Sequence, residues 1–406
     1  MTPAVWRNRD YMLLWSGQVV STTGSMASYA VIPLLILALT DSPAAAGTAA
    51  ALRWLPYMLF SLPGGALIDR WDRKRVMIIA DLGRALAIGS LPAAMFFGGL
   101  TVAQIYVVSF IEGTLFVFFN LAEVAALPHV VARGELPEAT ALNEAGFGTA
   151  HIVGPPIGTF LYQTLGRAVP LAIDALSYLV SVVSLVMIRA EFRSEARPEH
   201  RDLRKEVMDG LHWLWGKPLI RYMAFLTGGY NLVNGAAPLV IIVLAKQLGS
   251  SDAEIGVMFS MGGVGAIVGS LIGGRIQKRF TFGQVIVTLA WLNVAAMALF
   301  TLVPSPIGVG IVTGVIFFFG PIYNVVQFSY RIALIPDGLQ GRVNSVFRLL
   351  AFGFIPVGAA AGGAIIEGIG VIPCIVALTA WSVVLAVTAT FNRHVREAAS
   401  IDEMSK

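Results

Sequence analysis

Charged side chains are scarce in this chain. Asp, Glu, Lys and Arg make up only 13% of its 406 residues, whereas 56% of the residues are hydrophobic. So few charged groups cannot cover the surface that a water-soluble protein of this length exposes. The composition therefore excludes a soluble globular protein and indicates a chain that resides in the lipid bilayer.

Cysteine is nearly absent, and so are the patterns that carry chemistry. The single cysteine, Cys374, lies inside an apolar run, which excludes a disulfide framework and a cysteine metal cluster and favours a packing role. The sequence also has no phosphate-binding loop, no nucleophile paired with a base and no ligands at metal spacing. We therefore expect no cofactor, no metal, no enzymatic activity and no ATP-driven transport by this chain.

What the sequence does have is a series of apolar runs, each long enough to cross a bilayer as a helix of about 20 residues. These runs show no barrel-like alternation, and helices satisfy their own backbone hydrogen bonds in lipid. The prediction is an all-α polytopic membrane protein with twelve crossings. They are expected near residues 11–39, 45–67, 76–97, 101–126, 141–164, 168–188, 219–245, 254–274, 283–303, 306–329, 343–365 and 370–391.

The basic residues fall on one side of the predicted membrane. The net charge of +4 is modest, and only Arg167 and Lys246 lie in loops on the side opposite to the termini. By the positive-inside rule both termini are cytoplasmic, which an even number of crossings requires. The sequence thus predicts a multi-pass protein of the cell inner membrane with an uncleaved first crossing. The lipid bilayer is its expected surrounding, and nucleic acid is not an expected partner.

One long polar stretch, residues 189–217, separates six crossings from six. We predict an N-terminal half over residues 1–190, a cytoplasmic linker over 191–217 and a C-terminal half over 218–406. Leu203, Val207, Leu211 and Leu214 recur at helical spacing in the linker, which predicts an amphipathic helix along the cytoplasmic interface.

The two halves also resemble each other in sequence. Asn143 and Pro155 are matched at one offset by Asn344 and Pro356, in the fifth and eleventh crossings. Such repeats are typical of transporters whose two halves rock about a site at the membrane midplane.

The segment "GGALIDRWDRKR" after the second crossing places an acid, Asp69, at a membrane edge where acids are normally avoided. Together with the cations that follow, it resembles the cytoplasmic loop 2–3 motif of the major facilitator superfamily, although Asp72 stands where that family usually has glycine. The resemblance implies a cytoplasmic gate in which the acid meets the eleventh crossing and a loop arginine meets Glu123. The residues expected in this charge network are Gly65, Asp69, Arg70, Arg73, Arg75, Asp81, Arg84, Glu123 and Arg348, with Asp81 and Arg84 paired along one helix face.

The fifth crossing contains "HIVGPPIG", in which small residues recur every four positions. This stripe of Gly146, Ala150, Gly154 and Gly158 permits close helix packing, and we expect it to meet the Gly265, Gly269 and Gly273 stripe of the eighth crossing. Pro155 and Pro156 bend the helix. The pattern resembles the fifth-span motif of drug and proton antiporters, with Thr159 in place of a second glycine. Much of the chain is similar to the twelve-span group that includes macrolide efflux proteins and the enterobactin exporter.

Several ionisable residues lie deep in the predicted crossings, where such groups are costly and usually functional. Glu112 is about sixteen ångströms into the fourth crossing, counting 1.5 Å per residue. It could couple a proton or a cationic substrate, or it could pair with Arg53 or His151. His151 and Asp174 are also candidates for proton coupling, against packing for the histidine and a structural or gating charge for Asp174. On sequence alone, Glu112→Gln is expected to keep the fold and lose pH-dependent coupling.

The expected substrate surface is apolar and aromatic with a few amides, which suits an amphipathic organic molecule. Its candidate residues are Tyr29, Arg53, Glu112, Phe116, Tyr230, Asn231, Asn234, Phe317, Tyr323, Asn324 and Gln327. The sequence therefore favours a monomeric, proton-coupled exporter that works by alternating access. The alternatives are an exporter of siderophores, lysolipids or other metabolites, then an importer, and from another class a receptor or a membrane enzyme.

Overall fold

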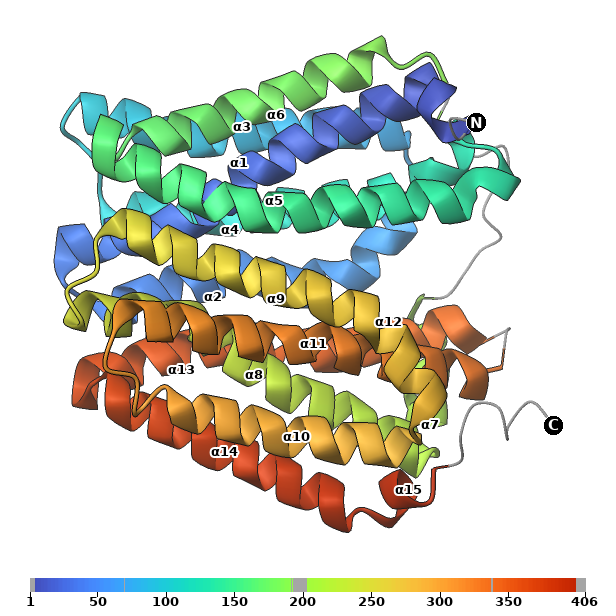
Figure 1. Ribbon diagram of the computed structural model, residues 1–406. Helices are drawn as coiled ribbons and strands as arrows, with labels where there is room; N and C mark the ends of the chain where they lie inside the picture. Colours follow the sequence, from blue (N-terminus) through green and yellow to red (C-terminus); the bar gives the residue numbers. More distant parts are fainter. Residues whose placement is uncertain (1–3, 69, 191, 193–202, 337–338, 399–406) are drawn as a thin grey trace. The chain divides into compact units, whose positions relative to one another are not determined.

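The computed structural model describes residues 4–68, 70–190, 192, 203–336 and 339–398 (Figure 1). These residues form helices joined by short connections, with no strand among them. Two compact units divide the chain. Unit 1 comprises residues 1–41 and 48–201, and unit 2 comprises residues 42–47 and 202–406. Each unit is described by itself below.

Unit 1 contains six long helices. They are α1 (Arg9–Thr40), α2 (Pro43–Ile68, whose first turn belongs to unit 2), α3 (Arg73–Phe96), α4 (Val102–Val130), α5 (Leu136–Leu165) and α6 (Val169–Met187). Short 3-10 turns precede α1 (η1, Ala4–Arg7) and α5 (η2, Arg133–Glu135). One core of this unit gathers around buried Tyr11, Leu14, Met77 and Phe119.

Unit 2 contains the remaining helices. They are α7 (Leu203–Trp215), α8 (Pro218–Gln247), α9 (Asp252–Arg279), α10 (Phe282–Leu299), α11 (Pro306–Leu334), α12 (Gln340–Phe352), α13 (Phe354–Ile369), α14 (Val371–Phe391) and α15 (Arg393–Arg396). Gly353 separates α12 from α13, so the eleventh predicted crossing is a broken helix. One core of this unit centres on Met223, Ile286, Val326 and Phe347.

The helices agree with the predicted crossings. Within the described residues, ten are long and apolar enough to cross a membrane, with α12 and α13 counted as one. The second and fifth predicted crossings correspond to α2, of 26 residues, and α5, of 30 residues. Both carry internal prolines, which a helix surrounded by others can accommodate. The prediction of an all-α polytopic fold is confirmed.

The same packing pattern occurs twice, once in each unit. In unit 1, α1 packs along α5 and α6, and α3 packs along α4 and α6. In unit 2, α8 packs along α13 and α14, and α10 packs along α11 and α14. The first helix of each unit therefore contacts the fifth and sixth crossings of that unit, as a duplicated six-helix fold requires.

Each glycine stripe packs on a helix of its own unit. A Cβ on Gly154 would lie 2.6 Å from Met26 Cβ, and one on Gly158 would lie 2.7 Å from Ala27 Cβ, both on α1. The stripe of α9 packs on α11, where a Cβ on Gly265 would overlap the Gly314 carbonyl. Spacing reveals a small-residue face but not the helix that covers it, and the contact between the two stripes stays a prediction.

Asp72, which stands where the superfamily usually has glycine, has a clear local role. It is the N-cap of α3, and its side chain accepts a hydrogen bond from the backbone N–H of Arg75 at 3.2 Å. Asp is among the best N-cap residues because its oxygen satisfies a backbone donor that the helix leaves free. The departure from the family pattern thus fixes the start of the third crossing.

The polar stretch between the halves contains α7. Its apolar side chains Val207, Leu211 and Leu214 pack on the core of unit 2, and Asp209 pairs with Arg342 of α12 at 3.1 Å. A Cβ on Gly210 would lie 2.7 Å from the Arg342 carbonyl oxygen. The apolar face of α7 is therefore turned towards protein, against α12.

Candidate functional site: a buried charge network and a pocket

Glu112 occupies the third turn of α4 and is only 2% exposed. Its two carboxylate oxygens contact different arginines. Arg53 Nε of α2 lies 2.8 Å from Glu112 Oε2, and Arg84 Nη2 of α3 lies 3.1 Å from Oε1. Three helices are thus joined by one carboxylate whose charge is matched by guanidinium groups. Because such pairs are costly to take out of water, they persist only when the geometry is good.

Arg84 is the hub of this network. Besides Glu112, its guanidinium donates to Asp81 Oδ1 at 3.2 Å, to Tyr178 Oη at 3.0 Å and to Ser25 Oγ at 3.2 Å. It also lies over the Tyr178 ring, 4.1 Å from the ring centre. The planar guanidinium of arginine presents five N–H donors in a fixed fork, whereas the ammonium group of lysine presents three. Side chains of α1, α3, α4 and α6 therefore meet at this one group.

Gly113 explains how Arg53 reaches Glu112. A methyl group placed on Gly113 would overlap the Arg53 carbonyl oxygen, so the backbones of α2 and α4 touch at this position. The guanidinium of Arg53 also lies 5.3 Å from the centre of the Tyr29 ring. Absence of a side chain next to Glu112 is what lets the second arginine approach.

Asp174 of α6 is the remaining acid of the region, and it is 1% exposed. Neither of its carboxylate oxygens has a hydrogen-bond partner within the part of the chain that the structure describes. The Ser28 hydroxyl of α1 and the charges of Arg84, Glu112 and Arg53 surround it. A Cβ on Gly24 would lie 2.8 Å from Asp174 Oδ1, so the backbone of α1 packs directly against this carboxyl group.

These contacts decide between alternatives that the sequence left open. Of the two partners proposed for Glu112, Arg53 makes the contact. His151 Nδ1 instead lies 3.0 Å from the Phe147 carbonyl oxygen of its own helix, with its ring 4.5 Å from the Phe147 ring. The predicted pair of Asp81 and Arg84 is present. It belongs to the network around Glu112, however, because Arg84 lies eleven residues after the first residue of α3 and not at the N-terminal end of this helix.

The predicted cytoplasmic gate is only partly visible, since Asp69 lies outside the described residues. Arg73, expected to meet Glu123, is buried and donates to the Phe192 carbonyl oxygen at 3.0 Å, with His129 Nε2 at 3.5 Å. Glu123 faces Gln18 of α1. The predicted pair of Arg73 and Glu123 is therefore wrong. Charge alone did not distinguish a carboxylate from a free carbonyl as the acceptor, and α4 continues beyond Glu123 to Val130.

The cations of this loop bind the carboxyl end of α6. Lys74 Nζ lies 2.6 Å from the Ile188 carbonyl oxygen, which follows the last residue of α6. Cations suit the free carbonyl groups and the negative dipole end of a helix. Arg75 is exposed beside Asp72, and Arg70 lies in an exposed turn. Gly65 has no neighbouring atom within 4 Å of an added Cβ, and Arg348 is exposed on α12 of unit 2.

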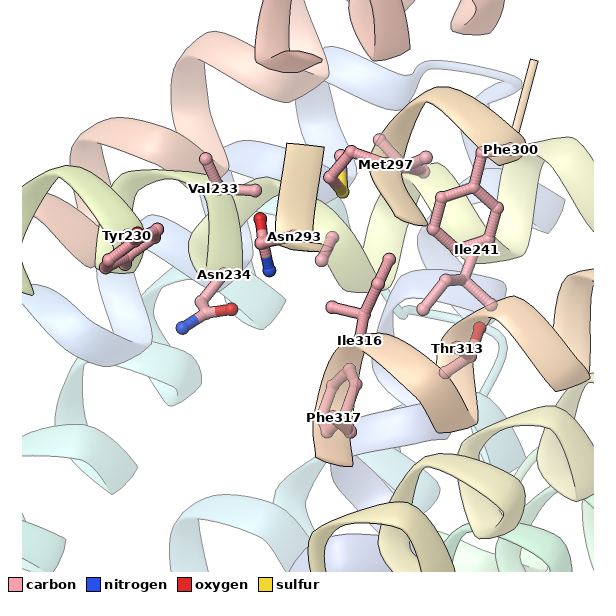
Figure 2. A pocket seen from close by; sticks show the side chains of 12 residues that line it. Tyr230, Val233, Asn234, Ile241, Asn293, Met297, Phe300, Thr313, Ile316 and Phe317 are labelled. Atoms are coloured by element: carbon pink, nitrogen blue, oxygen red, sulfur yellow. The ribbon is translucent and has the colours of Figure 1, made fainter. Parts of the chain in front are cut away.

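Unit 2 contains a pocket between α8, α10 and α11 (Figure 2). The unfilled space among its lining atoms is about 420 Å³ when the part that is open solvent is included. Tyr230, Asn234 and Phe317, three of the predicted substrate residues, line it. The wall is otherwise mainly aliphatic and aromatic, with the carboxamides of Asn234 and Asn293 as polar groups. Its other lining residues are Val233, Ala237, Val240, Ile241, Met297, Phe300, Thr313 and Ile316.

The other predicted substrate residues lie outside this pocket. Tyr323 is buried against Thr227 and Tyr230, with its hydroxyl 2.7 Å from Thr227 Oγ1. Asn231 donates to the Ala351 carbonyl oxygen at 2.9 Å, and Gln327 is buried beside Arg331. Asn324 is exposed. In unit 1, Tyr29 and Phe116 flank the arginines of the charge network.

Sequence reasoning missed two contributors to these sites. Tyr178 lies within hydrogen-bond distance of Arg84 and Ser25 and is fully buried. Asn293 lines the pocket from α10, a helix for which no site residue was predicted. A carboxamide in the middle of the run "TLAWLNVAAMAL" was a signal for Asn293, because polar groups at membrane depth are rarely accidental.

Comparison with known proteins agrees with the fold. The sequence profile of the transmembrane secretion effector family matches residues 2–406. The multidrug efflux pump Tap of Mycolicibacterium fortuitum is 26% identical over 95% of this chain and 96% of its own length. The enterobactin exporter EntS of Shigella boydii is 25% identical over 84% of this chain and 80% of its own length.

Two solved structures with this fold are of transporters. A bacterial homologue of the human lysosomal transporter Spinster, in an inward-facing state, gives a TM-score of 0.74 at 12% identity, over 96% of this chain and 97% of its own. The nucleoside transporter NupG gives a TM-score of 0.76 at 15% identity, over 94% of this chain and 100% of its own. At these identities the likeness concerns the fold.

A helical membrane fold in two repeated six-helix units, with charges buried inside one of them, defines a transporter of the major facilitator superfamily and not an enzyme. Within it, the chain belongs to the transmembrane secretion effector family.

Proposed function

We propose that this protein is a secondary active exporter of amphipathic organic compounds, driven by proton entry and working by alternating access. The observation that carries the proposal is the charge network of Arg53, Arg84 and Glu112 inside a helical unit of a transporter fold. Buried ionisable groups at membrane depth are expensive to keep and mark ion or proton pathways. The names of the relatives as a multidrug efflux pump and a siderophore exporter support the outward direction.

The pocket of unit 2 supports an amphipathic substrate. Ligand sites of this kind are mostly apolar with a few polar groups that fix orientation. Here Tyr230 and Phe317 supply aromatic surface, whereas Asn234 and Asn293 supply hydrogen bonds. A sugar would require a much more polar wall. The pocket is proposed to hold the apolar part of the substrate.

Proton coupling is proposed to act through the deep ionisable groups Glu112, His151 and Asp174. The antiporter pattern of Gly154, Pro155 and Gly158 packs α5 on α1, the helix that also contacts Arg84 and Asp174. The protein is proposed to act as a monomer in the cytoplasmic membrane, with both termini on the cytoplasmic side.

The test is efflux of ethidium, an amphipathic cation, from energised cells that produce the protein. Efflux faster than in cells carrying the empty vector, and abolished by a protonophore, is the expected result. Efflux unchanged by the protonophore would exclude the proton-coupled mechanism. A vesicle assay with an imposed pH gradient and no ATP provides the independent measurement.

A second candidate is export of a siderophore, which the relation to the enterobactin exporter favours. The two candidates predict different competitors. A catechol siderophore should slow ethidium efflux if it is the physiological substrate, and it should have no effect if the site is built for lipophilic cations.

A further inference from the structure

The ionisable groups around Glu112 and Asp174 in unit 1 do not balance in charge. Arg53 and Arg84 provide two positive charges, whereas Glu112, Asp81 and Asp174 would provide three negative ones if all were ionised. The two arginines are already engaged by Glu112 and Asp81 through contacts of 2.8–3.2 Å. One acid is therefore in excess.

The excess acid is identified by its contacts. Asp81 and Glu112 each accept from a guanidinium, but Asp174 does not. Within the described residues, neither of its oxygens accepts a well-formed hydrogen bond, and the hydroxyl group that faces it is that of Ser28 on α1. An unpaired carboxylate at 1% exposure would cost several kcal/mol, and a buried acid avoids this cost by taking up a proton.

We propose that Asp174 carries the coupled proton, and that Glu112 is a fixed charge that holds the arginines. The assignment rests on the proposed function and selects one carboxyl group from its candidates. In the structure described here, Asp174 is the neutral acid, and the network of two arginines and two carboxylates has no net charge.

The groups around Asp174 make its protonation state consequential. Arg84 faces it from α3, Glu112 from α4, Arg53 from α2, Tyr178 from its own helix, and the Ser28 hydroxyl from α1. α5 also packs against α6, but its charged side chains Glu138 and Glu144 and its His151 are not among the groups that act on Asp174.

Loss of the proton creates a negative charge that competes for Arg84. In the reaction Asp174–COOH releases H⁺ to water and becomes a carboxylate, so the network changes from neutral to one negative charge. Arg84 is then attracted by Asp174 of α6 as well as by Glu112 of α4. The protonation state of Asp174 thereby controls whether Arg84 of α3 is attracted by Glu112 of α4 alone or also by Asp174 of α6. Both α4 and α6 pack against α3.

Infrared difference spectroscopy of the full chain in liposomes tests the assignment without any substrate. At neutral pH, the difference between wild type and Asp174→Asn should contain the C=O stretching band of a protonated carboxyl group. Asp72→Asn is the matched control, because Asp72 is on the surface beside Arg75 and should contribute only a carboxylate band. A carboxylate band for Asp174 as well would overturn the proposal.

A second measurement keeps the test decisive if Asp174→Asn fails to fold. Wild-type protein labelled with carboxyl-¹³C aspartate must then show the protonated band displaced by the isotope, and an unmoved band would overturn the assignment.

Ethidium assays in vesicles separate the two proposals. Asp174→Asn should keep exchange of ethidium across the membrane but lose accumulation driven by a pH gradient. Gradient-independent transport by the wild type would contradict the proposed function itself, whatever the spectra show.

Discussion

Arg53 of α2 and Glu112 of α4 form an ion pair of 2.8 Å across 59 positions of sequence, inside a unit that also buries Arg84 against the same carboxylate. One acid thus neutralises parts of two cations, and the side chains of Arg84 and Glu112 are only 4% and 3% exposed. The structure changes what is expected of Glu112. A group clamped in this way is needed for folding, whatever its part in transport.

Glu112→Gln should destabilise the protein strongly. Removing one partner from a buried ion pair leaves the other charge unmatched, which costs about 3–5 kcal/mol. The melting temperature of the protein in detergent should fall by many degrees. It is measured from the loss of the monodisperse elution peak after heating. Asp72→Asn removes an exposed partner of Arg75 and should change stability by less than about 1 kcal/mol. A Glu112→Gln protein as stable as the control would show that the arginines do not require this carboxylate.

Gly154→Leu should destabilise unit 1 by forcing α5 away from α1. The added side chain would begin 2.6 Å from Met26 Cβ and 2.8 Å from the Thr23 carbonyl oxygen. Overpacking of this kind costs about 1–3 kcal/mol or more. Val153→Leu, on an exposed position of the same helix, is the matched control. Normal thermal stability of Gly154→Leu, with transport alone impaired, would instead favour a role of this face in motion between states.

Arg73 and Glu123 should behave as independent residues. Arg73 bonds to the Phe192 carbonyl, so a double-mutant cycle with Arg73→Gln and Glu123→Gln should give a coupling free energy below about 0.5 kcal/mol. Thermal or denaturant unfolding of the four proteins provides the measurement. The cycle of Arg53→Gln and Glu112→Gln is the positive control, for which coupling of at least about 1 kcal/mol is expected. Equal coupling in both cycles would restore the predicted gate pair.

Phe317→Ala should weaken ethidium transport. Loss of a ring from an apolar pocket wall costs the ligand about 1–3 kcal/mol, which corresponds to a rise in apparent KM of about 5-fold to 150-fold. Asn293→Leu should have a comparable effect on substrates that hydrogen-bond there. Ile311→Ala, on the exposed side of the same helix α11, is the control and should leave KM unchanged. Unaltered KM in both pocket variants would place the substrate elsewhere.

The helices and their number could be predicted from the sequence, because each crossing needs a long apolar run and the runs are separated by short polar loops. The pair of Asp81 and Arg84 could be predicted too, and Arg53 was one of the two partners considered for Glu112, since deep charges must find partners. Counting residues from Arg73 also gives the depth of Arg84 in its helix, which argues against a place in the gate. The prediction followed the many cations of the nearby loop instead.

The partners of helix faces could not be predicted. Periodicity places Gly154 and Gly158 on one side of α5, but two different helices could have covered that side, and α1 does. The same limit applies to the pocket, where Asn293 comes from a third helix that the spacing within α8 or α11 does not identify. Such choices depend on three-dimensional packing among segments far apart in the chain.

The only cysteine, Cys374, is fully buried in α14 with its Sγ near the Gly362 carbonyl. A thiol in that position does not react readily with maleimide or methanethiosulfonate reagents while the protein is folded. The wild-type chain therefore gives little background labelling when cysteines are introduced at other positions. Two engineered surface cysteines, one in each unit, would accept spin labels or fluorophores without prior replacement of native residues. Distances between such labels, recorded with and without a pH gradient, would follow the transport cycle in the otherwise unmodified protein.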